Sequence, residues 1–240
     1  MANERFQPAD VAVFILAGGR GTRLQRAWKG PKALVPVGDR PFLAYLLDEL
    51  DRAGFERVIL LTGDQGEAVE EAFSDREVTA LRERTPLGTG GALRAAAPLA
   101  RAANLILNGD SHCRLDWTAF LREAAANPQR LTVVAARMED AADYGTIEVD
   151  AGGLVTGFRE KAQGAGLVNA GIYLARGSFF VRDLAEEAGE DPLSLEKTVL
   201  PAMARERELA CWETERRFWD IGTPERLEQF RREMERERPA

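Results

Sequence analysis

A glycine-rich loop directly follows the first apolar run of the chain and contains the first residues that could do chemistry. The run covers residues 11–16, and Gly18, Gly19 and Gly21 come next. Because glycine has no side chain, such a loop can approach a ligand closely and offer it backbone N–H groups. Five positively charged residues lie between this loop and the next acidic residue: Arg20, Arg23, Arg26, Lys29 and Lys32. Amide groups and cations in this arrangement predict a polyphosphate site.

Two aspartates are candidate metal ligands. Asp110 closely follows the apolar segment 104–107, and Asp220 lies between two apolar residues, just before a glycine. In open α/β sheets, ligands bind at the carboxyl ends of strands. Two carboxylates, substrate phosphate oxygens and water suit Mg²⁺. Each aspartate taken alone could instead cap a helix or a turn, but the glycine loop elsewhere in the chain favours the metal site.

Two other glycine motifs fit this loop less well. A P-loop requires Gly-Lys-Ser/Thr, which occurs nowhere in the chain. A dinucleotide fingerprint could use Gly19 and Gly21, but Leu24 occupies its third glycine position, and Pro31 and Pro36 would break the helix that should follow. The simplest alternative is a flexible, basic surface loop.

The residues from Leu16 to Leu24, followed by Pro31 and Lys32, resemble the signature of sugar-1-phosphate nucleotidyltransferases. The resemblance covers most of the chain, from about residue 11 to residue 227. It implies that the glycine loop wraps the triphosphate of a nucleotide. It also implies that Arg23 and Lys32 are catalytic and stabilise the attacked α-phosphate and the leaving pyrophosphate.

In this family, an oxygen of the sugar 1-phosphate attacks the α-phosphorus of a nucleoside triphosphate in line. Asp110 and Asp220 match the family's metal aspartates, which implies Mg²⁺ as the cofactor. A phosphate oxygen is already nucleophilic near neutral pH, so positioning and charge neutralisation supply the chemistry. The single histidine, His112, is therefore expected to be structural or to contact substrate, not to act as a general base.

The same resemblance implies which residues contact each substrate. The expected nucleotide-binding residues are Leu16, Ala17, Gly18, Gly19, Gly21, Thr22, Arg23, Pro86, Gly88, Thr89 and Asn108. The expected sugar-phosphate-binding residues are Tyr144, Gly145, Glu160, Lys161, Asn169 and Gly171. In the family, the glutamate binds sugar hydroxyls and the lysine binds the sugar phosphate. The simpler interpretation of Glu160 and Lys161 is an exposed charged pair at the end of a strand.

Two further segments narrow the resemblance. Residues 85–91 and 140–146 are most similar to those of D-glycero-D-manno-heptose 1-phosphate guanylyltransferases, which implies GTP and that heptose phosphate as substrates. Residues 193–197 and Ser111 depart from this pattern, so the sugar stays open. The alternatives are a mannose-1-phosphate guanylyltransferase, another hexose-1-phosphate uridylyl- or cytidylyltransferase, and a catalytically silent sugar-nucleotide sensor. The intact charged residues oppose the sensor.

Composition and charge exclude other classes. The chain has 240 residues and a formal net charge of −7, with a pI near 5.1, which opposes general nucleic-acid binding. It has no run of 18 apolar residues and no apolar signal segment in residues 1–10, so we expect no membrane partner and a cytoplasmic location. The two cysteines, Cys113 and Cys211, are expected in or near the core. The resemblance is compatible with a homo-oligomer.

Apolar runs alternate with amphipathic segments in the first half of the chain. They predict strands at 11–16, 57–62, 77–82, 104–107 and 131–136, and helices at 41–53, 66–73, 92–102 and 117–126, with an extended piece at 33–37. Further on, the sequence predicts a hairpin at 145–149 and 154–158, strands at 167–174 and 209–214, and helices near 179–188, 193–207 and beyond Pro224.

This order of elements predicts a Rossmann-like α/β fold, in which helices flank a mixed, mainly parallel sheet. The resemblance implies the GT-A-like version found in nucleotidyltransferases. We expect a single domain over residues 1–240, with a nucleotide-binding half at about 11–137 and a sugar-binding half at about 138–227. The hairpin and the strand behind it predict a small β-rich lid over the second half.

Overall fold

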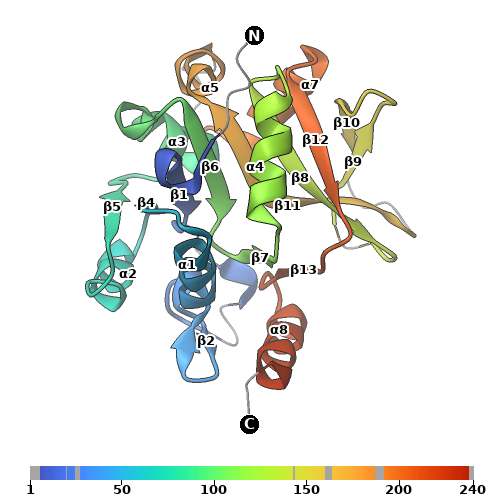
Figure 1. Ribbon diagram of the computed structural model, residues 1–240. Helices are drawn as coiled ribbons and strands as arrows, with labels where there is room; N and C mark the ends of the chain where they lie inside the picture. The colour runs from blue at the N-terminus through green and yellow to red at the C-terminus, as the bar shows by residue number, and fades with distance from the viewer. Residues whose placement is uncertain are drawn as a thin grey trace.

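A mixed β-sheet forms the centre of the molecule (Figure 1). The computed structural model describes residues 6–19, 21–24, 28–142, 144–159, 164–186 and 192–237. The strands of the sheet are β1 (Ala12–Leu16), β4 (Arg57–Thr62), β5 (Val78–Arg82), β6 (Ala103–Asn108), β8 (Leu131–Met138), β9 (Thr146–Val149), β10 (Val155–Arg159), β11 (Gly166–Arg176) and β12 (Leu209–Thr214). They follow the order β10-β9-β11-β6-β1-β4-β5, while β8 pairs with β11 and β12 pairs with β8.

The strands from the first part of the chain are parallel. β1 lies between β4 and β6, and β4 pairs with β5. The register places Leu16 beside both Leu61 and Asn108. The carboxyl ends of these strands therefore lie at one edge of the sheet, and the loops that follow them converge there. The predicted fold class is confirmed.

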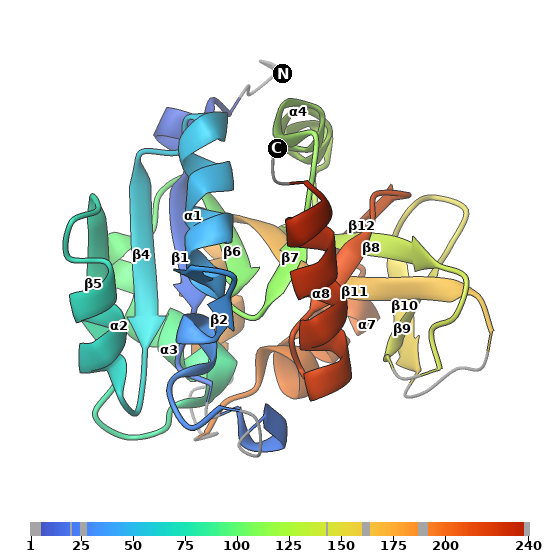
Figure 2. The same ribbon diagram turned by 90° about the horizontal axis from the view of Figure 1, so that it is seen from below.

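The strands from the second part of the chain continue the same sheet. β11 runs antiparallel to β6 and β8, and it bridges to β9 at Val168 and Thr146. The hairpin of β9 and β10 lies at the opposite end of the sheet from β5 (Figure 2). The strands expected to form a β-rich lid thus extend the sheet at the end opposite β5.

Helices cover both faces of the sheet. One core contains α1 (Phe42–Ala53) and α4 (Trp117–Ala126), and the other contains α3 (Gly88–Ala95), α5 (Gly177–Val181) and α7 (Leu200–Arg205). Val13 and Ile15 of β1 pack in the first core, whereas Ala12 and Phe14 pack in the second. Because side chains alternate along a strand, a strand covered on both faces is apolar throughout. This explains the apolar run at the start of the sequence.

A smaller unit brings the end of the chain to the carboxyl edge of the sheet. β7 (Ser111–Cys113) pairs with β13 (Phe218–Asp220), which places Asp220 opposite Ser111. The last helix, α8 (Pro224–Arg236), lies beside these strands and α1 (Figure 2). Its Phe230 packs against Phe42 of α1 with ring centroids 4.9 Å apart. Asp220 is thereby brought next to the turn that contains Asp110.

Several elements differ from the sequence prediction. The helix expected at 92–102 begins at Gly88 and ends at Ala95, because the Leu193 carbonyl accepts hydrogen bonds from the Gly90 and Gly91 amides and a short 3₁₀ turn with Pro98 follows. The piece expected to be extended at 33–37 starts as a 3₁₀ turn (Lys32–Leu34), followed by β2 (Pro36–Val37) and β3 (Arg40–Pro41).

The helices expected late in the chain are also divided. The one near 179–188 appears as α5 and α6 (Asp183–Glu186), and residues 187 and 188 lie outside the described residues. The one near 193–207 is a π-helical turn (Leu195–Val199) followed by α7. The remaining helix, α2 (Gly66–Ala72), agrees with the prediction. None of the helices in the described part of the chain has both the length and the apolar character that a membrane crossing requires.

The cysteines lie in or beside the hydrophobic cores, and the histidine is buried. Both cysteines are free, Cys113 buried and Cys211 half-buried, and burial raises the pKa of each thiol to about 12. His112 is only 3% exposed, and its Nε2 lies 3.1 Å from Glu49 Oε2. The imidazole therefore connects β7 to α1.

Candidate active site

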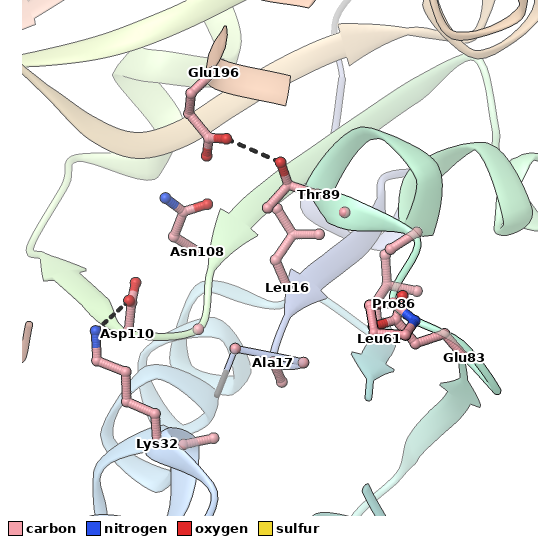
Figure 3. A pocket seen from close by; sticks show the side chains of 16 residues that line it. Leu16, Ala17, Lys32, Leu61, Glu83, Pro86, Thr89, Asn108, Asp110 and Glu196 are labelled. Carbon is pink, nitrogen blue, oxygen red and sulfur yellow. Dashed lines mark hydrogen bonds and ion pairs between the residues drawn. The ribbon is translucent and has the colours of Figure 1, made fainter. Parts of the chain in front are cut away.

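A cavity of about 340 Å³ lies at the carboxyl ends of the parallel strands (Figure 3). The segments that follow β1, β5 and β6 form part of its wall, and β4 contributes Leu61. The 3₁₀ turn at Lys32–Leu34, α3 and the π-helical turn form the remaining sides. The lining residues are Leu16, Ala17, Gly18, Gly19, Lys32, Ala33, Leu61, Glu83, Pro86, Gly88, Thr89, Ala92, Asn108, Gly109, Asp110 and Glu196. This is the location at which an α/β sheet binds its ligand.

The first glycine loop forms part of the wall beside β1. A Cβ atom on Gly18 would lie 3.2 Å from the backbone nitrogen of Gly63, whereas a Cβ on Gly19 would meet no atom within 4 Å. Gly18 therefore allows the loop after β4 to pack closely, and Gly19 faces open space. The backbone at Gly19 is accessible to a ligand in the cavity.

An ion pair joins the loop region to the end of β6. Lys32 Nζ lies 2.5 Å from Asp110 Oδ2 (Figure 3). The Asp110 side chain is 39% exposed, while that of Lys32 is 12% exposed. Ser111 Oγ donates a weaker hydrogen bond of 3.3 Å to Asp110 Oδ1. The carboxylate thus combines one close cation with access to the cavity.

Asp220 has more partners and less exposure. Its Oδ2 accepts a hydrogen bond of 2.6 Å from the Tyr144 hydroxyl, and its Oδ1 accepts one of 2.7 Å from the Gly222 amide. Arg226 Nη1 lies 3.1 Å from both carboxylate oxygens, and its guanidinium carbon lies 4.1 Å from the centre of the Tyr144 ring. The Ile221 amide donates to the Asp110 carbonyl, so this cluster adjoins Asp110.

The two aspartates carry the type of ligand that a divalent metal ion prefers. Mg²⁺ binds carboxylate oxygens and substrate phosphates and uses few protein ligands. Within the described residues, no group of three or more acidic, histidine or cysteine side chains could hold a metal. In the structure a cation already lies against each carboxylate, Lys32 on Asp110 and Arg226 on Asp220. Both positions therefore favour positive charge.

The structure brings many of the predicted site residues together and leaves others elsewhere. Those that line the cavity are Leu16, Ala17, Gly18, Gly19, Lys32, Pro86, Gly88, Thr89, Asn108 and Asp110. Those that the structure describes outside this lining are Gly21, Arg23, Tyr144, Gly145, Asn169, Gly171 and Asp220. Glu160, Lys161 and the side chain of Thr22 lie outside the described residues.

Two of the predicted residues outside the lining adjoin the site. Gly21 has a φ of +56°, and a Cβ there would lie 3.3 Å from the Cβ of Lys32. The Arg23 side chain is exposed, and its Nη2 would lie 3.7 Å from a Cβ on Gly222. Arg23 therefore lies close to the turn that follows Asp220.

Asn169 supports a bulge in β11 instead of lining the cavity. The pairing of β11 with β8 shifts between Asn169 and Tyr173. Asn169 Oδ1 accepts from the Gly171 amide at 2.9 Å, and its Nδ2 donates to the Tyr173 hydroxyl at 2.8 Å. Gly171 has a φ of +68°, and a Cβ there would lie 2.6 Å from Asn108 Nδ2. The bulge thus lets Asn108 reach its place in the wall.

Sequence reasoning missed two acidic residues of the cavity. Glu83 follows β5, and Glu196 belongs to the π-helical turn. Glu83 is the first residue after a parallel strand, which is a signal that could have been used. No comparable signal exists for Glu196, because Thr89, its hydrogen-bond partner, lies 107 residues earlier in the chain.

Comparisons with known proteins agree with this geometry. The model of the nucleotidyl transferase family matches residues 12–237. A D-glycero-alpha-D-manno-heptose 1-phosphate guanylyltransferase from Campylobacter jejuni is 33% identical over 217 residues, 88% of this chain and 94% of that one. A mannose-1-phosphate guanylyltransferase catalytic subunit beta from Drosophila pseudoobscura is 32% identical over 222 residues, 88% of this chain but only 58% of that subunit.

A solved structure gives the same result. The crystal structure of HddC from Yersinia pseudotuberculosis complexed with GMP-PN has a TM-score of 0.80 and 29% identity. The similarity covers 93% of this chain and 99% of HddC. The match of the family model over nearly the whole chain, the relatives and the shared fold lead to one conclusion: the chain belongs to the nucleotidyl transferase family.

Proposed function

We propose that this protein transfers the guanylyl group of GTP to D-glycero-α-D-manno-heptose 1-phosphate and releases pyrophosphate. The family match and the Campylobacter relative support the reaction and the sugar. The single observation that carries the choice of base is the carboxylate of Glu83 in the cavity wall. We infer that residues 11–137 bind the nucleotide and residues 138–227 the sugar phosphate. We also infer a cytoplasmic reaction, where nucleoside triphosphates are available.

Glu83 lies at the end of the cavity away from the charged pair. Lys32 and Asp110 lie on one side of Ala17, and Glu83, Pro86 and Leu61 lie on the other (Figure 3). A triphosphate suits the side that has the ammonium group, and a base suits the side with Pro86 and Leu61. The base would therefore lie next to Glu83.

The orientation of Glu83 is fixed by the backbone around it. Its amide donates to the Thr62 carbonyl at 2.9 Å, and its Oε2 accepts from the Leu87 amide at 3.1 Å. An ionised carboxylate only accepts hydrogen bonds. Guanine offers two adjacent donors, N1–H and the N2 amino group, whereas uracil and thymine offer one N–H between two carbonyl oxygens. A carboxylate at this place favours guanine.

Charge neutralisation and positioning supply the chemistry of the transfer. An oxygen of the sugar phosphate attacks the α-phosphorus, the bond from that phosphorus to the β-phosphate breaks, and pyrophosphate leaves with the electron pair. Lys32 lies where it can offset the negative charge on the phosphates. The open backbone at Gly19 can approach them without steric conflict. No protein base is required, because the attacking phosphate oxygen is already ionised.

Enzymes of this family generally use a divalent metal ion. We propose that the ion is Mg²⁺ and that Asp110 and Asp220 hold it, since their oxygens form a donor set that suits it. When bound, the ion would neutralise phosphate charge and orient the phosphates. Lys32 would then turn from Asp110 to the phosphates, while Arg226 would stay beside Asp220.

Pyrophosphate release tests the proposal directly. We would combine GTP, ATP, UTP and CTP with heptose 1-phosphate, mannose 1-phosphate and glucose 1-phosphate in the presence of Mg²⁺. We expect the highest kcat/KM with GTP and the heptose phosphate. A higher kcat/KM with mannose 1-phosphate would mean that mannose 1-phosphate is the sugar substrate, which is the sugar phosphate named for the Drosophila relative. No release with any pair, from folded protein that binds a nucleotide, would favour a silent sensor.

The role of Glu83 can be tested by Glu83→Gln. An amide can accept only one of guanine's two donors and offers a donor of its own, so kcat/KM for GTP should fall about 10–100-fold, in line with the loss of one good base contact. The preference over UTP should shrink by a similar factor. Glu71→Gln, on the exposed side of α2, is the matched control. An unchanged preference for GTP over UTP in Glu83→Gln would refute this base contact.

A further inference from the structure

Three carboxylates line a cavity that is expected to accept a triphosphate. They belong to Glu83, Asp110 and Glu196, and the ammonium group of Lys32 is the only cation in the described lining. Because carboxylates repel phosphates, each needs a cation or a hydrogen-bond donor as a neighbour. Lys32 serves Asp110, and a base would serve Glu83. Glu196 has one donor, the Thr89 hydroxyl, which binds only one of its two oxygens.

The position of Glu196 is fixed by contacts with α3. Thr89 Oγ1 accepts a hydrogen bond of 2.8 Å from the Leu195 amide and donates one of 2.9 Å to Glu196 Oε2. The Leu193 carbonyl accepts from the Gly90 amide at 3.0 Å. These bonds hold the π-helical turn against the first turn of α3. Single π-helical turns occur frequently at functional sites.

The second oxygen of Glu196 is available to a ligand. Only Oε2 takes part in a hydrogen bond with another described residue, and the side chain lines the cavity. Figure 3 shows Glu196 above Asn108, which reaches into the same space from the end of β6. The Oδ1 atom of Asn108 is buried and has no hydrogen-bond partner in the structure. A carboxylate with one unused oxygen and an amide therefore line the same cavity.

The hydroxyl of Tyr173 is a buried polar group close enough to Glu196 to be affected by its charge. Burial raises the pKa of the Tyr173 hydroxyl well above its usual range, and the negative charges of Glu196 and Asp110 raise it further. Tyr173 is fully buried, so it stays neutral and adds no charge beside Glu196. A neutral ligand group that donates a hydrogen bond therefore fits Glu196 better than a phosphate does.

We propose that Glu196 binds a hydroxyl group of a sugar, with Thr89 as the residue that orients it. A hydroxyl donates to the carboxylate and can also pair with the amide of Asn108. The hydroxyl belongs either to the ribose of the nucleotide or to the sugar 1-phosphate, and both offer the same chemistry. The proposal rests on the proposed function, since it requires that one of these substrates enters the cavity.

Calorimetry and steady-state kinetics on Glu196→Gln distinguish the two sources. We would titrate GTP, 2′-deoxy-GTP and 3′-deoxy-GTP, with Mg²⁺, into wild type and variant, and measure KM for the sugar 1-phosphate. A hydrogen bond to a charged group predicts a loss of about tenfold or more. If the ribose is bound, the variant loses affinity for GTP but not for the matching deoxynucleotide. If the acceptor sugar is bound, only its KM rises.

Two further variants separate hydroxyl binding from a loss of structure. Thr89→Ser keeps the orienting hydroxyl and should retain at least half of the wild-type value of the affected parameter, whereas Thr89→Val should reproduce the loss seen in Glu196→Gln. Lys197→Gln is the matched control, because Lys197 belongs to the same turn and its side chain is exposed. Thermal unfolding of each variant checks the fold.

The outcomes separate this proposal from the proposed function. If wild type binds none of the four nucleoside triphosphates, the proposed function fails. If wild type binds GTP but Glu196→Gln changes neither nucleotide affinity nor the sugar-phosphate KM by more than about twofold, the assignment of Glu196 alone is wrong. An equal loss for GTP and for both deoxynucleotides would also contradict it, since no ribose hydroxyl would then be involved.

Discussion

Two neighbouring aspartates, Asp110 in the turn before β7 and Asp220 at the end of β13, lie in different surroundings. The Asp110 side chain is 39% exposed, and one flexible side chain, that of Lys32, provides its close countercharge. The Asp220 side chain is 13% exposed and accepts from a tyrosine hydroxyl, a backbone amide and a guanidinium. The cation beside Asp110 can therefore be exchanged for another, whereas the groups that bind Asp220 are held in place by the fold.

The difference indicates what each carboxylate does for the protein. A lysine ammonium on a flexible stem can leave Asp110 when another cation arrives, and the carboxylate remains accessible. At Asp220, two of the three donors belong to the turn at Gly222 and to the first turn of α8, so they stay in place. We therefore expect Asp110 to act mainly on ligands, and Asp220 to act on ligands and on stability together.

The largest effect that follows from this difference is on turnover in Asp110→Asn. Removing a metal-binding charge should reduce kcat by about 10³-fold or more. The free energy of unfolding should change by less than about 0.5 kcal/mol, because the site is partly exposed. Pyrophosphate release at saturating substrates and urea unfolding measure the two quantities. Full activity of Asp110→Asn with Mg²⁺ would show that Asp110 does not bind the metal ion.

Asp220→Asn should give a smaller loss of turnover and a larger loss of stability. The neutral amide keeps the volume but removes the ion pair with the nearly buried Arg226. We expect kcat to fall about 10²-fold and the free energy of unfolding to fall by about 1–3 kcal/mol.

Urea unfolding of Asp110→Asn, Asp220→Asn and Asp64→Asn side by side tests the comparison. Asp64 is exposed in the loop after β4 and serves as the control. If Asp220→Asn is no less stable than Asp110→Asn, the distinction between an exchangeable and a built-in charge is wrong.

The sequence predicts the framework of this site better than its acidic residues. The apolar run of β1 and the glycines behind it have a direct physical meaning, since a strand buried on both faces must be apolar and a close approach requires glycine. Asp110 is found for a similar reason, because it closely follows a buried strand. Glu83 follows a strand in the same way, but that strand is not buried and its signal is weaker, and Glu196 belongs to no such pattern. Their role depends on how β5, α3 and the π-helical turn meet in three dimensions.

The start of α3 illustrates the same limit. Glycine disfavours helix, so the sequence predicts that residues 88–91 form a loop. In the structure Gly88 has a φ of +78°, and a Cβ at Gly88 would collide with the Leu193 carbonyl oxygen. The same carbonyl accepts hydrogen bonds from the Gly90 and Gly91 amides. A contact from a segment about a hundred residues later thus decides the local structure, and local propensity cannot reveal it.

The smallest predicted effect concerns metal binding without nucleotide. In the free protein Lys32 competes with a metal ion for Asp110, so Lys32→Met should bind Mn²⁺ about tenfold more tightly than wild type, as the removal of one nearby unit charge predicts. Electron paramagnetic resonance of free Mn²⁺ measures this affinity independently of turnover. Lys29→Met, three residues earlier and exposed, is the control and should not change it.

Adding GTP sharpens the test. Phosphate oxygens give Lys32 a new partner in wild type, so the lysine no longer opposes the metal at Asp110. The advantage of Lys32→Met should therefore disappear when nucleotide is present, and kcat should be low because the cation at the phosphates is missing. Equal Mn²⁺ affinity in wild type and Lys32→Met without nucleotide would mean that the lysine does not occupy a metal position. The contrast with Asp220, whose donors stay in place, would then lose its physical basis.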